Sequence, residues 1–186
     1  MKRFFDVLLS IPLLLLSLIP LIVVSVAILL TSKGPVLHWS KRVGRDNALF
    51  LMPKLRTMTI DVPDVATHLL ENPSSYVTPI GKFLRKYSID ELPQFYSIII
   101  GDMSLVGPRP ALYNQEDLIL LRKKAGIDTL LPGVTGLAQV RGRDELSIDT
   151  KVDIERNYLL QKSFMFDLYI IWLTLVKVLK KDDISH

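Results

Sequence analysis

The sequence has no cysteine in its 186 residues, which excludes disulfide bonds, thiolate metal sites and a cysteine nucleophile. Histidine is scarce as well, and the three histidines lie too far apart in sequence to suggest a zinc site. Internal repeats and low-complexity tracts are also missing. Any catalytic nucleophile must therefore be an oxygen or a nitrogen atom.

The chain is long enough for one compact domain plus an appendage, and too short for two full domains. Its net charge of +4 and isoelectric point near 9.3 suit nucleic acid, anionic lipid or phosphorylated small substrates. The basic residues are not interleaved with an aromatic stacking platform, and no nucleic-acid recognition motif is present. We therefore expect no nucleic-acid partner.

A run of 24 residues without charge extends from Val7 to Leu30. As a straight helix it would rise about 36 Å, enough to cross a bilayer core of roughly 30 Å. It is too long for a signal-peptide core of roughly 7 to 15 residues, so we expect it to be retained. Pro12 and Pro20 kink a helix, basic residues flank both ends, and a break at Pro20 leaves halves too short to span. From the residues alone, a spanning helix and a re-entrant hairpin are equally supported, with Ser17 and Ser25 available to bond carbonyls freed at the kink.

The rest of the chain predicts a helix-dominated α+β fold. The stretch "VLHWSKRVGRDNALFLMPKLRTM" reads as two extended runs around a turn at 44–47, a short β-hairpin. Residues 59–80 predict one short helix and a loop, and further helices are expected near 82–86, 91–100, 111–125 and 150–162. The final stretch, "SFMFDLYIIWLTLVKVLKK", predicts an amphipathic helix that lies on a membrane surface or packs in the core, in preference to a second span.

Two adjacent carboxylates, Asp90 and Glu91, lie in the stretch "YSIDELPQ". Ser88 and Glu91 match a helix capping box, but Pro93 would then interrupt the helix interior. With Asp90 as the N-cap, Pro93 becomes the third helical residue, where no backbone donor is needed. A carboxylate at a helix start explains the pair structurally and also lies where a phosphate can bind.

Three segments rich in glycine or proline carry arginines that suit phosphate binding. Arg109 lies between two prolines in "GDMSLVGPRP", and Arg141 and Arg143 follow the glycines of "PGVTGLAQVRGRDE". Arg85 lies upstream, within about one turn of Asp90. Each arginine alone is explained as a solvated surface charge, but three such segments are more than a fold needs.

Five of these stretches resemble the bacterial sugar transferase family, the small monotopic phosphoglycosyl transferases. They are "KRFFD" at 2–6, "PKLRTM" at 53–58, "GKFLRKYSIDELPQ" at 81–94, "GDMSLVGPRP" at 101–110 and "PGVTGLAQVRGRDELS" at 132–147. The resemblance runs from Lys2 to about Lys180, in the order found in the family.

The resemblance implies that a nucleotide diphosphate sugar, usually UDP-linked, gives its phosphosugar to a polyprenol phosphate and releases UMP. It implies that Asp90 is the nucleophile and that Glu91 is associated with Mg²⁺. It further implies a re-entrant membrane helix over residues 1–32, broken at Pro20, and a small globular catalytic domain with membrane-surface helices over residues 33–186. The expected location is the cytosolic face of the bacterial inner membrane, with phospholipid as a partner.

The resemblance also assigns expected binding residues. By position these are Arg85, Arg109 and Arg143, together with Pro110 and Arg141, and with Lys54 and Arg56 as weaker candidates. The chain departs from the family in "KVDIERNYL", where Glu155 stands three residues before Tyr158 in place of a frequent Asp. Whether Glu155 or Asp153 takes that role is open, and nothing in the sequence explains Leu137 in place of a frequent Trp.

Two other functions compete with this one. A glycosyltransferase that passes only the sugar would release UDP, although the chain has no D-x-D metal motif. A membrane scaffold would use Asp90 only as a cap and the arginines to bind anionic lipid. The sequence does not specify the sugar or the glycan pathway, and it leaves a homodimer open.

Overall fold

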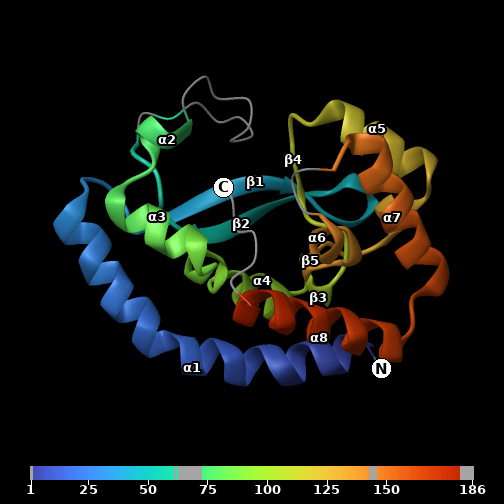
Figure 1. Cartoon of the computed structure of the whole chain (residues 1–186), viewed down its shortest axis with the longest axis horizontal. Coiled ribbons are helices and arrows are strands. Elements are labelled where there is room, and N and C mark those ends of the chain that lie inside the picture. The colour runs from blue at the N-terminus through green and yellow to red at the C-terminus, as the bar shows by residue number, and fades with distance from the viewer. Residues whose placement is uncertain (1, 61, 63–72, 143–145, 181–186) are drawn as a thin grey trace.

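The computed structural model describes residues 2–60, 62, 73–142 and 146–180. Two small sheets lie at the centre of an α+β fold in which helices predominate, which confirms the expected class (Figure 1). Most of the loop expected at 59–80 and the position of Arg143 lie outside the described residues.

The predicted hairpin is present. Strands β1 (Leu37–Val43) and β2 (Leu49–Leu55) pair antiparallel, with Leu37 opposite Leu55 and Val43 opposite Leu49. The turn between them contains Asp46 and Asn47 at positive φ, a conformation that Asp and Asn tolerate better than most residues. Strand β4 (Ala111–Leu112) pairs with β1, so the order β2-β1-β4 leaves β2 at an edge. Strands β3 (Ser104–Val106) and β5 (Gly133–Thr135) form a separate parallel pair.

Apart from a short helix at Leu137–Arg141, which the sequence did not predict, the helices follow the sequence expectations with shifted boundaries. They are α2 (Pro73–Tyr76), α3 (Pro79–Lys86), α4 (Gln94–Ile100), α5 (Glu116–Lys124), α6 (Leu137–Arg141), α7 (Ile148–Gln161) and α8 (Phe164–Lys180). Local signals set several ends: Thr78 caps α3 ahead of a proline, Ser147 caps α7, and Gly101 at φ 108° ends α4. The helix expected at 111–125 begins later because Ala111 and Leu112 pair as β4.

The long apolar run forms one helix, α1 (Lys2–Thr31), which passes through Pro12 and Pro20 without interruption. Its axis bends as it follows one side of the molecule (Figure 1). Ser17 and Ser25 donate to the carbonyls of Leu14 and Leu21. Pro20 lacks the backbone N–H that would bond the carbonyl of Leu16, and neither serine bonds that carbonyl. The expected hydrogen bonds from these serines to the carbonyl freed by Pro20 are therefore wrong.

Helix α1 has its polar side chains inside and its apolar side chains outside. Asp6, Ser10 and Ser17 are buried against the rest of the protein, whereas Leu16 and Ile19 are each 75% exposed. In the described part of the chain, α1 alone is long and apolar enough to cross a membrane. A lipid-facing surface is the environment that makes this inverted pattern favourable, so the helix associates with membrane.

The N-terminal end of α1 is tied to the globular part by three charged residues. Arg3 donates to the carbonyls of Ile98 and Ile99 at the end of α4. Asp6 is buried and accepts from Ser104 Oγ at 2.8 Å and from the Leu105 amide at 3.3 Å, both in β3.

Lys2 adds an ion pair between α1 and α8. Its Nζ lies 2.5 Å from Asp167 Oδ2 and 3.0 Å from the Val106 carbonyl. The hydroxyl of Tyr158 in α7 donates to the other carboxylate oxygen of Asp167 at 2.7 Å. The motif "KRFFD" is therefore the anchor of the membrane helix.

The C-terminal end of α1 is tied down as well. Arg56, which follows β2, is buried and donates to the carbonyls of Ser32 and Lys33 and to Ser32 Oγ. Nearby, Ile28 packs with Leu55 and Leu84 in a fully buried cluster. Both ends of α1 thus contact the same globular body.

Helix α8 is amphipathic, as expected, and lies beside the first half of α1 (Figure 1). Asp167 and Ile170 are buried, whereas Phe164, Trp172 and Leu175 are exposed. One face therefore packs on the protein and the other adds to the apolar surface of α1.

We predict that Asp6→Ala destabilises the fold by about 3 kcal/mol, because it leaves the Ser104 hydroxyl and the Leu105 amide buried without an acceptor. The midpoint of denaturant unfolding in detergent micelles measures this change. Asp153→Ala is the matched control, because Asp153 is exposed on α7. Equal midpoints for the two variants would contradict the role of Asp6.

Candidate active site

The carboxylate pair lies in a short 3₁₀ turn, η3 (Ile89–Glu91), between α3 and α4. Ser88 adopts a left-handed conformation with φ 54° and turns the chain into η3. The amides of Glu91 and Leu92 bond the carbonyls of Ser88 and Ile89, so the turn is complete before α4 begins at Gln94.

This geometry corrects the expected N-cap. Asp90 does not cap α4, because Pro93 occupies the cap position, and Ser88 makes no side-chain capping bond. The prediction that Pro93 lies at the start of a helix, where no backbone donor is required, is confirmed. The left-handed Ser88 has no clear signal in the sequence and shifts the helix start.

Asp90 is 8% exposed and lies among cationic side chains. Burial lowers the pKa of Arg85, and the negative charge of Asp90 opposes that shift. The same carboxylate opposes the lowering of the pKa of Lys54 by burial. The Nε atom of Arg85 donates to Thr57 Oγ1 at 2.9 Å, which fixes the guanidinium group beside the turn.

Glu91 forms two ion pairs through one oxygen. Its Oε1 lies 3.1 Å from Lys54 Nζ and 2.9 Å from Arg109 NH2. Burial alone would raise the pKa of Glu91, but Arg109 and Lys54 hold this pKa well below its ordinary value. Glu91 is therefore ionised at any physiological pH.

A fourth cation, Arg42, belongs to the same cluster and was missed from the sequence. It donates to the Pro110 carbonyl at 3.1 Å and to Ser40 Oγ at 2.9 Å, and its charge contributes to lowering the pKa of Lys54. The alternation of side chains in the hairpin could have identified Arg42. Residues 38, 40 and 42 point to the same face of the sheet as 50, 52 and 54, so Arg42 and Lys54 lie on one face.

We call Arg42, Lys54, Arg85, Arg109, Asp90 and Glu91 the dyad cluster. It joins β1, β2, α3, η3 and the loop that precedes β4. Its four cations outnumber its two carboxylates, which favours a ligand with several negative charges.

Other predicted residues lie outside the cluster. Arg56 holds the end of α1, and Arg141 is exposed at the end of α6, a helix that packs on α7 and α8. Pro110 contributes its carbonyl to Arg42 and no charge.

Glu155 and Tyr158, where the sequence departs from the family pattern, have partners within the protein. Glu155 is buried and pairs with Arg122 of α5 through two bonds of 2.8 and 2.5 Å. Burial and the bond to Asp167 raise the pKa of Tyr158. Asp153 is exposed on α7, and the side chain of Glu155 is held by Arg122 of α5.

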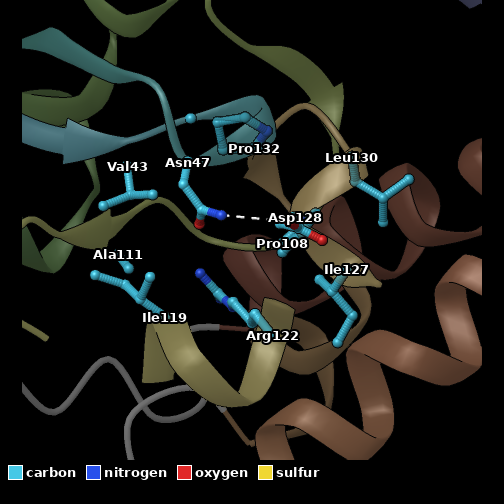
Figure 2. A pocket seen from close by; sticks show the side chains of 11 residues that line it. Val43, Asn47, Pro108, Ala111, Ile119, Arg122, Ile127, Asp128, Leu130 and Pro132 are labelled. Atoms are coloured by element: carbon cyan, nitrogen blue, oxygen red, sulfur yellow. Dashed lines mark hydrogen bonds between the residues drawn. The ribbon is translucent and has the colours of Figure 1, made fainter. Parts of the chain in front are cut away.

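A small cavity near Arg122 is separate from the dyad cluster. It has a volume of about 20 Å³, and Asn47 donates across it to Asp128 at 3.3 Å (Figure 2). Room for about one water molecule cannot hold a nucleotide. The dyad cluster is thus the better candidate for a substrate site.

The structure therefore combines two carboxylates among four cations with a long apolar helix whose apolar side faces outward, which defines a membrane-associated protein with a candidate site for an anionic ligand. The chain belongs to the bacterial sugar transferase family, whose sequence profile matches residues 1–181.

Several relatives support this membership. The chain is 34% identical to the undecaprenyl-phosphate galactose phosphotransferase of Salmonella typhimurium, over 98% of this chain and 41% of the relative. It is 36% identical to the UDP-glucose:undecaprenyl-phosphate glucose-1-phosphate transferase of Klebsiella pneumoniae, over 95% of this chain and 39% of the relative. The chain therefore spans about two fifths of the length of these two proteins. It is also 37% identical to the uncharacterized sugar transferase EpsL of Bacillus subtilis, over the whole chain and 91% of the relative.

We predict that Arg109→Gln lowers the free energy of unfolding by about 2 kcal/mol at pH 7, because Glu91 keeps only Lys54 as a partner. This is less than for a fully buried pair, since the Arg109 side chain is 34% exposed and partly screened. The folded pKa of Glu91 is depressed, so the stability from its ion pairs is present above its ordinary pKa of 4.5 and is lost as the pH falls below that value.

The difference between the variant and the unsubstituted chain should shrink as the pH falls from 5 into the acid range, because Glu91 with one cationic partner is protonated at a higher pH than Glu91 with two; denaturant unfolding measures this change. Arg45→Gln serves as the control because Arg45 is exposed in the hairpin turn. A difference that does not depend on pH would show that Arg109 acts through packing alone.

Proposed function

We propose that the protein is a phosphoglycosyl transferase that moves a phosphosugar from a UDP-sugar to a polyprenol phosphate and releases UMP. The dyad cluster supports this proposal, because it contains a buried carboxylate, the proposed nucleophile, together with four cations. The names of the Salmonella and Klebsiella relatives include undecaprenyl phosphate as acceptor, which supports the acceptor class.

Asp90 is the proposed nucleophile. A carboxylate can attack without a general base, and the charge of Asp90 interacts with the cations of Arg85 and Lys54. One oxygen of Asp90 attacks the β-phosphorus of the donor and forms an acyl-phosphate bond. The bond from that phosphorus to the bridging oxygen breaks, and UMP leaves with the electron pair.

The acceptor completes the reaction. A phosphate oxygen of the polyprenol phosphate attacks the same phosphorus, and the bond to Asp90 breaks to restore the carboxylate. The product is a polyprenyl diphosphosugar, and the two steps predict ping-pong kinetics.

The cations hold the diphosphate during both steps. Arg109 lies between Pro108 and Pro110, and Arg42 bonds the carbonyl of Pro110, so the guanidinium of Arg109 is held on a stiff loop. Such positioned charges stabilise negative charge on the transferring phosphoryl group and on the leaving UMP.

Mg²⁺ is the proposed cofactor. Within the described residues, no group of three His, Cys, Asp or Glu residues could hold a metal ion without further ligands. Mg²⁺ at phosphate sites commonly uses one or two carboxylates and takes its other ligands from substrate and water. Glu91 fits this requirement, because both of its ion pairs use Oε1 and leave Oε2 as an available ligand. A bound Mg²⁺ would neutralise charge on the diphosphate.

We further propose that α1 is a re-entrant helix in the cytosolic leaflet of the bacterial inner membrane, with Pro20 near its bend. The contacts at both ends support this. Lys2, Arg3 and Asp6 at the start, and the carbonyls of Ser32 and Lys33 at the finish, all bond one globular body. A helix with its two ends on opposite sides of a bilayer could not keep both sets of contacts.

We predict that Asp90→Asn abolishes UMP release from UDP-sugars in the presence of undecaprenyl phosphate and Mg²⁺, because an amide cannot form the acyl-phosphate bond. A panel of UDP-sugars, scored by chromatography of the released nucleotide, tests the reaction class and the sugar together. Asp153→Asn is the control on the exposed face of α7.

The same assay separates the competing functions. UDP as product would identify a transferase of the sugar alone, and undiminished turnover by Asp90→Asn would remove Asp90 as nucleophile. A scaffold predicts no nucleotide release by the unsubstituted chain with any donor.

We predict that an N-terminal epitope tag and a cysteine at Lys33→Cys are both inaccessible from the periplasm. The chain has no native cysteine, so a membrane-impermeant maleimide reports only the introduced one. In intact spheroplasts the antibody should not bind the tag and the maleimide should not label the cysteine. After lysis both sites should be detected. Reaction of one site alone in intact spheroplasts would show that α1 spans the membrane.

A further inference from the structure

Gln94, the first residue of α4, has a buried amide group without a hydrogen-bond partner. The residue is 2% exposed, and within the described part of the chain its Nε2 atom meets no acceptor. A buried donor without an acceptor is unfavourable, and such an atom typically serves a function or bonds a buried water molecule. Gln94 lies only three residues after Glu91, so the dyad cluster is the first place to look for its partner.

The side chain of Gln94 lies on the same face of the chain as Asp90. The Phe95 amide bonds the Leu92 carbonyl, so the backbone continues in helical turns from η3 into α4. Asp90, Gln94 and Ile98 follow one another at intervals of four residues and are all buried, which places them on one face. Because the side chains of a helix lean toward its N-terminus, the amide of Gln94 extends toward Asp90.

This face packs against β2, the strand that carries Lys54. Both η3 and α4 contact β2. Met52 of β2 and Ile98 belong to one buried core cluster, whereas Lys54, two residues further along the strand, bonds Glu91. Gln94 lies between Glu91 and Ile98 in the chain. Its amide is therefore at the border between the hydrophobic core and the cations of the dyad cluster.

We infer that Gln94 is a phosphate-binding residue of this site, an inference that rests on the proposed function. Its Nε2 donates a hydrogen bond to a non-bridging oxygen of the phosphoryl group held at Asp90, so the substrate supplies the acceptor that the free protein lacks. No covalent bond to Gln94 forms or breaks. An amide carries no charge, so Gln94 makes no ion pair with Asp90 or Glu91 and its donor stays available for the ligand.

Unfolding measures whether the amide is unused in the free protein. Gln94→Met keeps a long unbranched side chain and removes the donor. Because no hydrogen bond is lost, its midpoint of denaturant unfolding in detergent micelles should equal or exceed that of the unsubstituted chain.

Gln115→Met is the matched control for unfolding. The Oε1 atom of Gln115 accepts from the Leu112 amide at 2.8 Å, so this variant loses a bond and its midpoint should fall. A fall of the same size in Gln94→Met would show that the amide of Gln94 has a structural partner and would overturn the inference.

Binding of inorganic pyrophosphate in the presence of Mg²⁺ tests the phosphate contact without any sugar donor or acceptor. Isothermal titration calorimetry on the full chain in micelles should give a Kd about tenfold higher for Gln94→Met, the loss typical of one hydrogen bond to a charged group. Gln161→Met should keep the Kd, because Gln161 is exposed at the end of α7. An unchanged Kd in Gln94→Met would mean that the amide bonds a buried water molecule or Asp90. That result would overturn the inference, as would a lack of pyrophosphate binding by the unsubstituted chain.

Turnover separates this inference from the proposed function. In the assay of UMP release, Gln94→Met should lower kcat/KM for the UDP-sugar at least tenfold, because a donor to the transferring phosphoryl group is lost. UMP release at the unsubstituted rate, with an unchanged Kd for pyrophosphate, would overturn the role of Gln94 and leave the proposed function standing. Weaker pyrophosphate binding by Gln94→Met, in a protein that releases no UMP with any donor, would overturn the proposed function and leave the phosphate contact standing.

Discussion

The anchor of α1 by Lys2, Arg3 and Asp6 is the interaction on which the rest of the structure depends. These charges bond strand β3, the end of α4, and Asp167 of α8, so the polar side of an otherwise apolar helix must face the protein. The apolar side is then left outward, where only lipid makes its exposure favourable. Because Asp6 is buried, the anchor also fixes how the helix is rotated about its own axis.

The elements that hold α1 also carry the dyad cluster. Helix α4 is bonded by Arg3 where it finishes and is preceded by the turn that contains Asp90 and Glu91. Strand β2 carries Lys54, and two residues later Arg56 bonds the end of α1. The height of the carboxylates above the lipid surface is therefore set by short, rigid connections. This suits the proposed reaction, in which a water-soluble donor meets an acceptor phosphate at the membrane surface.

The sequence predicted the parts that local patterns determine. Alternating residues placed the hairpin at β1 and β2, and the motifs brought Asp90, Glu91, Arg85, Arg109 and Lys54 into one cluster. The sequence could not show long-range contacts or irregular backbone geometry. Arg56 and Glu155 were candidates from the sequence, and in the structure their partners are Ser32 and Arg122, which no local pattern links to them. The left-handed conformation of Ser88 is likewise not visible in the sequence, and because of it the chain forms η3 first and α4 is capped by Pro93 instead of Asp90.

Glu91 gives the site a further property, because its single oxygen Oε1 is shared by Lys54 and Arg109. In the free protein these two cations are already partly neutralised, so a simple anion from solution must compete with a carboxylate for them. A ligand with one negative charge gains little by this exchange. A diphosphate offers several oxygens to each cation and can bring a metal ion for Glu91, so every group that loses a partner acquires another. Under the proposed function, the ion pairs of Glu91 therefore favour an anion with several charges over one with a single charge.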